Sequence, residues 1–220
     1  MRLRKKPWIS EALREYSHFV YRQANEDFQG QWQGIFGGQA PLHVELGTGK
    51  GQFISGMAQV YRDVHFIGIE AQQDVLYYAA QKVAAAELDN VRLLVFDINH
   101  VLQIFAREEV NRFYINFCDP WPKSRHDKRR LTHRRFLAMY SQLLAPGGEI
   151  HFKTDNRDLF DFSLEEFAGQ GWQLDKVTYD LHNSVYAAGN IMTEYEKKFS
   201  ASGLIHRLEA RPPGSPASPK

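Results

Sequence analysis

The chain has 220 residues, of which 43% are hydrophobic and 24% charged, the composition of an ordinary globular protein. Its formal net charge is only +1, so any argument for a polyanionic partner depends on where the basic residues lie. The single cysteine, Cys118, excludes a disulfide framework and a cysteine-rich zinc site, and we expect no metal ion. No apolar run reaches the length of a membrane span, and the basic residues 1–6 lead into Pro7 rather than into an apolar segment. These features predict a cytoplasmic protein with neither a signal peptide nor a membrane contact.

Residues 1–40 are polar and aromatic, and we expect them to form an N-terminal extension that is flexible. A short amphipathic helix is predicted over residues 10–21, and the Gly- and Gln-rich stretch 29–38 predicts a loop. Residues 41–211 have the pattern of one folded domain. Residues 212–220 are rich in Pro and Ser and predict a disordered tail.

Segments with strand and helix patterns alternate along the domain. Strands are predicted at 42–46, 65–70, 91–96, 112–117 and 149–153, and helices at 52–61, 74–88, 134–144 and 159–169. Two late segments, 173–177 and 196–208, are candidates for closing antiparallel strands. This order predicts an α/β fold with a mostly parallel central sheet, helices on both faces and an antiparallel C-terminal strand.

The residues of unusual type come directly after predicted strands. They are the glycine-rich turn 47–51, Glu70, Asp97 and the segment Asp119-Pro120-Trp121-Pro122. Ligands of such sheets bind outside the carboxyl ends of the strands. The pattern therefore predicts that these residues line one edge of one sheet.

The turn Gly47-Thr48-Gly49-Lys50-Gly51 places a glycine at every second position between a strand and a helix. Without Cβ atoms the backbone turns tightly and can lie close to a ligand. A turn of this kind also occurs without a ligand, and related turns bind NAD, FAD or phosphates. The G-x-G-x-G spacing differs from the dinucleotide pattern G-x-G-x-x-G and favours S-adenosylmethionine.

Three acidic residues strengthen that interpretation. Glu45 precedes the glycines, where a cationic aminoacyl group or sulfonium would lie. Glu70 ends the second strand and is placed to accept hydrogen bonds from ribose hydroxyls, and Asp97 ends the third, where it would meet the adenine amine. A single carboxylate at a strand end is more often a helix cap or a solvated residue. Three such acids in register after a glycine turn indicate S-adenosylmethionine as the cofactor.

A dense basic run follows the fourth strand. Five of the eight residues from Lys123 to Arg130 are Lys or Arg. Charge runs are often solvated surface, but this one adjoins Asp119, which favours contact with nucleic acid phosphates. Trp121 fits two interpretations equally, as a platform for an exposed base or as a buried anchor of the corner. Two later polar clusters, 153–157 and 193–196, offer the donors and acceptors that a guanine edge requires, although each also fits a cap or turn.

These motifs resemble those of the bacterial tRNA (guanine-N7-)-methyltransferases, and the similarity runs from about residue 2 to residue 209. The shared motifs are VELGTGKG at 44–51, FIGIE at 66–70, DPWPK at 119–123 with RH and KRR downstream, FKTD at 152–155 and TEYE at 193–196. The resemblance implies a Rossmann-like class I methyltransferase fold and S-adenosylmethionine as methyl donor. It also implies that the product is 7-methylguanosine at position 46, in the variable loop of tRNA.

The same resemblance implies roles for individual residues. Cofactor contacts are implied for Glu45, Gly47, Gly49, Glu70, Asp97 and Asp119, and Asp119 is also the candidate catalytic residue. Substrate guanine contacts are implied for Lys123, Asp155, Thr193, Glu194, Tyr195 and Glu196. RNA contacts are implied for Arg125, His126, Lys128, Arg129 and Arg130. The chain departs from the family at Thr48, where serine is frequent, and at 97–99, which leaves the adenine contact least defined.

Several alternatives stay open at this level. The segment 116–121 is faintly similar to the motif of amino-methyltransferases that act on adenine or cytosine, although its aromatic residue comes one place early. A small-molecule methyltransferase would not need the basic run, and a catalytically silent RNA-binding subunit would not need the strand-end acids. The basic residues Arg2, Arg4, Lys5 and Lys6 fit an RNA contact or a flexible tail equally well, and the protein is expected to be a monomer or a homodimer.

Overall fold

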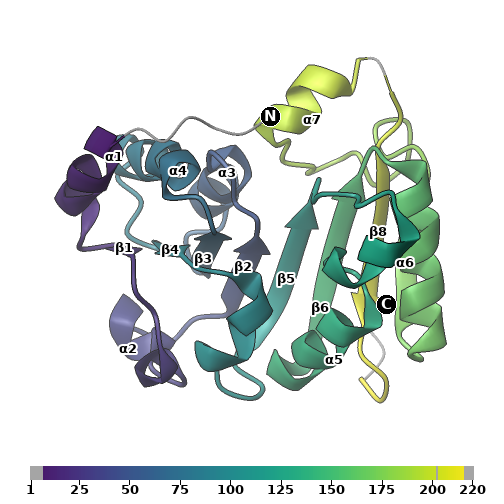
Figure 1. Ribbon diagram of the computed structural model, residues 1–220, viewed down its shortest axis with the longest axis horizontal. Helices are drawn as coiled ribbons and strands as arrows, with labels where there is room; N and C mark the ends of the chain where they lie inside the picture. The colour runs from purple at the N-terminus through teal and green to yellow at the C-terminus, as the bar shows by residue number, and fades with distance from the viewer. Residues whose placement is uncertain (1–6, 202, 216–220) are drawn as a thin grey trace. The chain divides into compact units, whose positions relative to one another are not determined.

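The structure is a computed structural model that describes residues 7–201 and 203–215. The chain divides into two compact units, Met1–Ile104 and Phe105–Lys220 (Figure 1). The basic residues of 1–6 and most of the predicted tail lie outside the described residues. Within the described residues, no helix combines the length and apolar character needed to cross a membrane.

The first unit contains a parallel sheet. Its elements are α1 (Pro7–Ala12), the 3-10 helix η1 (Leu13–Tyr16), β1 (Val20–Tyr21), η2 (Glu26–Phe28), α2 (Trp32–Phe36), β2 (Leu42–Leu46), α3 (Gln52–Val60), β3 (His65–Glu70), α4 (Gln73–Ala85), β4 (Val91–Val95) and η3 (Ile98–Gln103). The strands lie in the order β1-β4-β3-β2, and every neighbouring pair in this unit is parallel. Strands β2 and β3 are almost entirely buried, as expected when both faces of a parallel sheet are covered.

The extension 7–40 contains more regular structure than its sequence predicts. The stretch predicted as a loop over 29–38 contains α2, and this prediction was wrong. Trp32 of α2 is fully buried, and its indole N–H donates to the carbonyl of Ile104 at 2.8 Å. The short strand β1 pairs with β4 through Val20 and Leu93. Burial against distant residues therefore overrides the local loop signals of glycine and glutamine.

The second unit contains a mixed sheet. Its elements are β5 (Val110–Asn116), η4 (Ser124–Arg129), α5 (Arg134–Leu143), β6 (Leu144–Thr154), α6 (Arg157–Gly169), β7 (Gln173–Thr178), α7 (Glu194–Phe199) and β8 (His206–Arg211). The strand order is β5-β6-β8-β7, with β5 parallel to β6 and both later pairs antiparallel. The expected antiparallel closing strands are confirmed. The segment 196–208, however, begins in helix α7, because Thr193 and Glu196 form a capping box.

The two faces of the second unit's sheet differ in character, because successive side chains of a strand point to opposite faces. Phe113 of β5 packs on Tyr140 of α5, and Phe152 of β6 stacks on Phe160 of α6, with ring centroids 5.0 and 6.2 Å apart. On the other face, Lys153 and other charged residues of β6 and β8 replace the apolar side chains. The polar face therefore carries the charge clusters described below.

Candidate functional site

The glycine turn after β2 adopts the backbone conformation that requires glycine. Gly47, Gly49 and Gly51 have φ values of +83°, +58° and +79°. A Cβ atom at Gly51 would lie 2.6 Å from Cβ of Ala79, so this glycine allows α3 and α4 to pack closely. At Gly47 a Cβ would meet nothing within 4 Å of the described chain, which leaves its backbone open to a ligand.

Two of the predicted cofactor residues hold this turn in place. Glu45 is buried at 3% exposure, and its carboxylate accepts a hydrogen bond from the Thr48 hydroxyl at 2.9 Å. Glu70 accepts from the backbone N–H groups of Gly49 at 3.2 Å and Gln72 at 3.0 Å. Both carboxylates thus lie at the carboxyl ends of the neighbouring strands β2 and β3.

Gly68 is a further position that sequence reasoning missed. It lies inside β3, and a Cβ there would come within 2.6 Å of the Thr48 hydroxyl oxygen. The available signal was a glycine within a strand, which often marks a close approach by another part of the chain. Gly68 therefore makes room for the glycine turn.

Asp97 follows β4, on the same edge of the first unit's sheet as Glu70. Its exposed carboxylate accepts from the backbone and side-chain N–H groups of Asn99 at 2.9 and 2.7 Å, which caps η3. The helix-cap interpretation thus describes its present contacts, and its contact with adenine stays a prediction.

The corner after β5 has an uncommon backbone. Phe117 and Trp121 both have positive φ values, +52° and +42°, although neither is a glycine. Asp119 lies between them with its side chain exposed. Desolvation, together with the charge of Asp119, raises the pKa of the Cys118 thiol to about 12. The thiol is therefore protonated at neutral pH and is not a nucleophile.

The basic run forms an exposed surface with one exception. Lys123, Arg125, Lys128 and Arg129 are exposed on or beside η4. The Arg129 guanidinium lies 4.8 Å from the centroid of the Trp121 ring, and the His126 ring meets the same indole edge-on at 5.9 Å. Arg130 instead points toward the corner, where its guanidinium donates to the carbonyls of Pro120 and Trp121. Trp121 is half-buried, so both interpretations of its role remain.

A buried ion cluster fixes the start of α7. Nζ of Lys153 lies 2.8 Å from Oε2 of Glu196, and the two side chains are 6% and 0% exposed. The same ammonium donates to Oδ1 of Asn190, and the Asn190 amide in turn donates to Oε1 of Glu196 at 2.7 Å. His182 lies 3.1 Å from the same oxygen, and the Thr193 hydroxyl accepts from the Glu196 backbone N–H at 2.9 Å. Sequence reasoning missed His182 and Asn190, because only the folded loop brings them to Glu196.

Asp155 and Tyr195 form the exposed part of the same region. The Tyr195 hydroxyl donates to Oδ2 of Asp155 at 2.9 Å, and the Tyr195 ring is 41% exposed. This ring packs on Phe117 and Phe199 with centroid distances of 5.1 and 4.3 Å. Burial, followed by the hydrogen bond to Asp155, raises the pKa of Tyr195, so the hydroxyl stays a donor. The structure thus brings an acceptor and an aromatic face together beside the end of β5.

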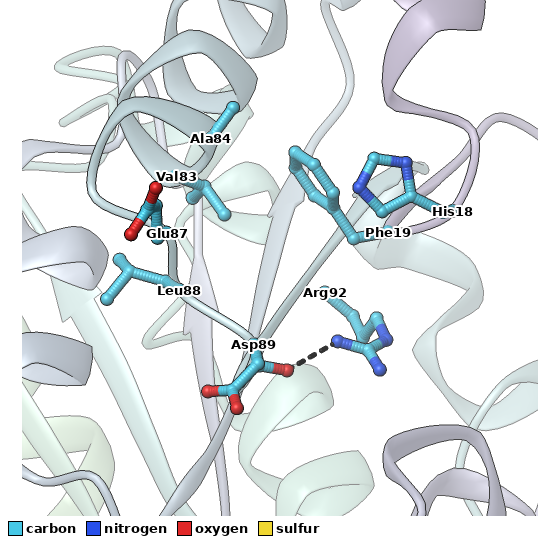
Figure 2. Close-up of a pocket in the computed structure, with 8 residues that line it drawn as sticks. All are labelled: His18, Phe19, Val83, Ala84, Glu87, Leu88, Asp89 and Arg92. Atoms are coloured by element: carbon cyan, nitrogen blue, oxygen red, sulfur yellow. Dashed lines mark hydrogen bonds between the residues drawn. The ribbon is translucent and has the colours of Figure 1, made fainter.

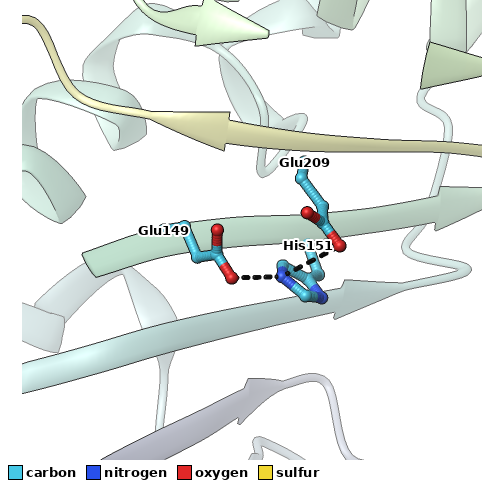
Figure 3. Close-up of side chains that lie close together, drawn as sticks. All are labelled: Glu149, His151 and Glu209. Atoms are coloured by element: carbon cyan, nitrogen blue, oxygen red, sulfur yellow. Dashed lines mark hydrogen bonds and ion pairs between the residues drawn. The ribbon is translucent and has the colours of Figure 1, made fainter. Parts of the chain in front are cut away.

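Three side chains on the polar face bring possible metal-ligand atoms within 4.8 Å of one another: Glu149, His151 and Glu209 (Figure 3). Nε2 of His151 lies 2.7 Å from Glu149 and 3.4 Å from Glu209. Each carboxylate already pairs with a cation, since Arg112 lies 2.6 Å from Glu149 and Lys176 lies 2.9 Å from Glu209. These cations would repel a metal ion, so the cluster fits a charge-balanced network better than a metal centre.

A shallow cavity of about 380 Å³ lies in the first unit beside the end of α4 (Figure 2). His18, Phe19, Glu87, Asp89 and Arg92 line much of it. Arg92 stands near the start of β4, whereas Asp97 follows its end, so the cavity lies away from the edge that carries the glycine turn. Its mixed charges point to no particular ligand.

Comparisons with known proteins agree with this arrangement. Residues 39–206 match a family described as "Putative methyltransferase". The chain is 50% identical to the tRNA (guanine-N(7)-)-methyltransferase of Listeria monocytogenes serotype 4a, over 96% of this chain and 98% of that protein. It is 51% identical to the enzyme of the same name from Bacillus licheniformis and 50% identical to that from Bacillus subtilis, with 96% and 95% of this chain covered and 98% of each relative.

Solved structures show the same fold. An antibiotic-related methyltransferase superposes with a TM-score of 0.63 at 17% identity, covering 86% of this chain and 93% of that one. The 16S rRNA methyltransferase KamB superposes with a TM-score of 0.65 at 13% identity, covering 89% and 99%. The predicted fold class is confirmed, and fold and glycine turn together define a Rossmann-like methyltransferase. Within that class, the chain belongs to the tRNA (guanine-N(7)-)-methyltransferase family.

Proposed function

We propose that this protein transfers the methyl group of S-adenosylmethionine to N7 of a guanine in the tRNA variable loop, at position 46. The relatives described above are named tRNA (guanine-N(7)-)-methyltransferases and align along almost the whole chain, whereas the variable-loop position 46 comes from the family resemblance. The observation that carries the proposal is the set of three acids and a glycine turn on one edge of the first unit's sheet. With tRNA as substrate, the cytoplasm is the proposed place of the reaction.

The first unit's residues fit a bound S-adenosylmethionine. Glu70 is an acceptor-only carboxylate held by two backbone N–H groups at the end of β3, and it is proposed to accept hydrogen bonds from the ribose hydroxyls. The open backbone at Gly47 and Gly49 allows close approach, and Glu45 supplies negative charge for the cationic aminoacyl end. Asp97 is proposed to accept from the adenine amine. The bound cofactor supplies an electrophilic methyl group on a sulfonium.

The second unit's residues fit a guanine. Lys123 is exposed and is proposed to donate to O6, the acceptor beside N7. Asp155 keeps acceptor capacity for N1 and the exocyclic amine, and the exposed Tyr195 ring offers a surface for the base. Glu196 is fully buried, so its proposed contribution is to hold the segment 193–196 in place. The exposed cations Arg125, Lys128 and Arg129 are proposed to contact phosphates.

Methyl transfer to N7 needs no general base, because N7 carries an in-plane lone pair and no proton. The chain's task is therefore to align N7 with the methyl group and to stabilise the charge that the ring gains. Asp119 is proposed to supply that negative charge and to contact the cofactor. We expect Asp119→Asn to lower the single-turnover rate at saturating tRNA. An unchanged rate in this variant would contradict the electrostatic role.

Two tRNA transcripts test the proposed substrate position. One has guanine at position 46 and the other has adenine there, with all other nucleotides identical. We expect methyl incorporation from labelled S-adenosylmethionine into the first transcript only. Equal incorporation into both would show that the enzyme acts at another position.

A further inference from the structure

We propose that Arg130, the last residue of the basic run, is a positioning residue that holds the Asp119 corner and does not contact RNA. The inference rests on the proposed function, since it concerns how the proposed catalytic carboxylate is placed. It separates Arg130 from the exposed cations beside it. The resemblance stated above would group all of them as RNA contacts.

The backbone of the corner that carries Asp119 is strained. Phe117 and Trp121 lie two residues before and after Asp119, and both adopt left-handed backbone conformations at φ +52° and +42°. Side chains with a Cβ disfavour this region, and Trp121 is restricted further because Pro122 follows it. Strained residues of this kind persist only when surrounding contacts hold them.

One end of the corner is held by the sheet and the other by Arg130. The backbone N–H of Phe117 donates to the carbonyl of Lys153 at 2.9 Å, which continues the pairing of β5 with β6. Nε of Arg130 donates to the carbonyl of Pro120 at 3.1 Å, and Nη2 donates to that of Trp121 at 3.1 Å. The guanidinium also lies 4.2 Å from the centroid of the Phe162 ring on α6. Arg130 thus ties the strained residue to a helix of the same unit.

The geometry distinguishes this role from phosphate binding. Nε and Nη2 of Arg130 are committed to main-chain oxygens, whereas Lys128 and Arg129 are exposed. Lysine also binds phosphate as a point charge, so a charge-dominated phosphate contact keeps its salt dependence when lysine replaces arginine. A fork that bonds two successive carbonyls depends on the planar guanidinium. Arg130→Lys therefore separates the two roles, because it keeps the charge and removes the fork.

The experiment measures the single-turnover rate at saturating tRNA and S-adenosylmethionine, and the tRNA affinity as a function of salt. Both are expressed per folded molecule, with the folded fraction taken from circular dichroism. For Arg130→Lys and Arg130→Gln we expect a rate at saturation lowered about 10- to 100-fold, as small misplacements of reacting groups cause. We expect the slope of log affinity against log salt to stay that of the wild type in both variants.

Three further variants serve as comparisons for the Arg130 variants. Arg129→Gln should weaken tRNA binding and reduce the salt slope by about one, as loss of a phosphate contact does. Arg107→Gln, an exposed arginine outside the basic run, should match the wild type in both measurements. Phe162→Leu removes the ring beneath the guanidinium and should lower the rate without changing the salt slope, which keeps the test open if Arg130→Gln folds poorly.

Two results would overturn the inference: a wild-type rate in Arg130→Lys, or a salt slope reduced by one in Arg130→Gln with a normal rate at saturation. A wild-type enzyme that methylates no tRNA would instead refute the proposed function. In that case the salt slopes still decide whether Arg130 contacts RNA, so the two failures are distinguishable.

Discussion

Replacing Lys153 by methionine tests how strongly the buried cluster holds the proposed guanine segment. The change removes the ammonium 2.8 Å from Glu196 and leaves a carboxylate that is 0% exposed without its cation. Breaking a buried ion pair from one side costs about 3–5 kcal/mol. Because Asn190 and His182 still contact the Glu196 carboxylate, we expect the lower end, about 3 kcal/mol. In a chain of this size that lowers the melting temperature by about 6–12 °C.

Thermal unfolding followed by circular dichroism measures the effect, and two variants calibrate it. Lys176→Met removes one of the two cations paired with Glu209, and Arg207 remains. Because the Lys176 side chain is also 45% exposed, we expect a loss below about 1 kcal/mol. The double variant Lys153→Met/Glu196→Gln removes both charges and should be more stable than Lys153→Met alone. A Lys153→Met melting temperature equal to that of Lys176→Met would refute the reasoning.

The remaining predictions concern the glycine turn and the polar face. Gly51→Ala should lower the free energy of unfolding by about 2 kcal/mol or more, because its Cβ would meet Ala79 at 2.6 Å at a φ of +79°. Gly47→Ala, where the space is open, should cost about 1 kcal/mol and chiefly weaken S-adenosylmethionine binding in calorimetry; the opposite ranking in stability would contradict this. Burial lowers the pKa of His151. For Glu149, desolvation raises the pKa, but the hydrogen bond from His151 and the nearby cations outweigh it and lower the pKa to about 2. Both groups bind more protons when unfolded, so stability should fall as pH drops below about 6.5 and again from about 4.5 toward 2. In a His151→Gln variant the melting temperature should change less with pH between about pH 7.5 and 5. A pH dependence equal to that of the wild type would exclude His151 as the cause.

The glycine turn and the strand ends could be predicted because their signals are local. A buried apolar strand followed by alternating glycines has one common structural solution, and the structure shows it at 47–51. Helix α2 could not be predicted, since its stability comes from Trp32 contacting Ile104, more than seventy residues away.

In the candidate site, too, contacts between distant residues could not be predicted from the sequence. The segment 193–196 could be recognised as polar, but its sequence does not reveal that Glu196 is buried against Lys153 while Tyr195 is exposed. Likewise, the sequence of the basic run does not distinguish one cation from another. Only the fold shows that Arg130 bonds to the Trp121 carbonyl, whereas Arg129 lies over the Trp121 ring. Periodicity predicts elements, whereas the partner of a charged side chain depends on contacts between distant segments.

The most direct test of the account is the identity of the methylated nucleoside. The purified protein is incubated with labelled S-adenosylmethionine and an unmodified tRNA transcript, and the RNA is digested to nucleosides for mass spectrometry. The account predicts label in 7-methylguanosine alone. Label in a methylated adenosine or cytidine, or no label although tRNA is bound, would contradict it.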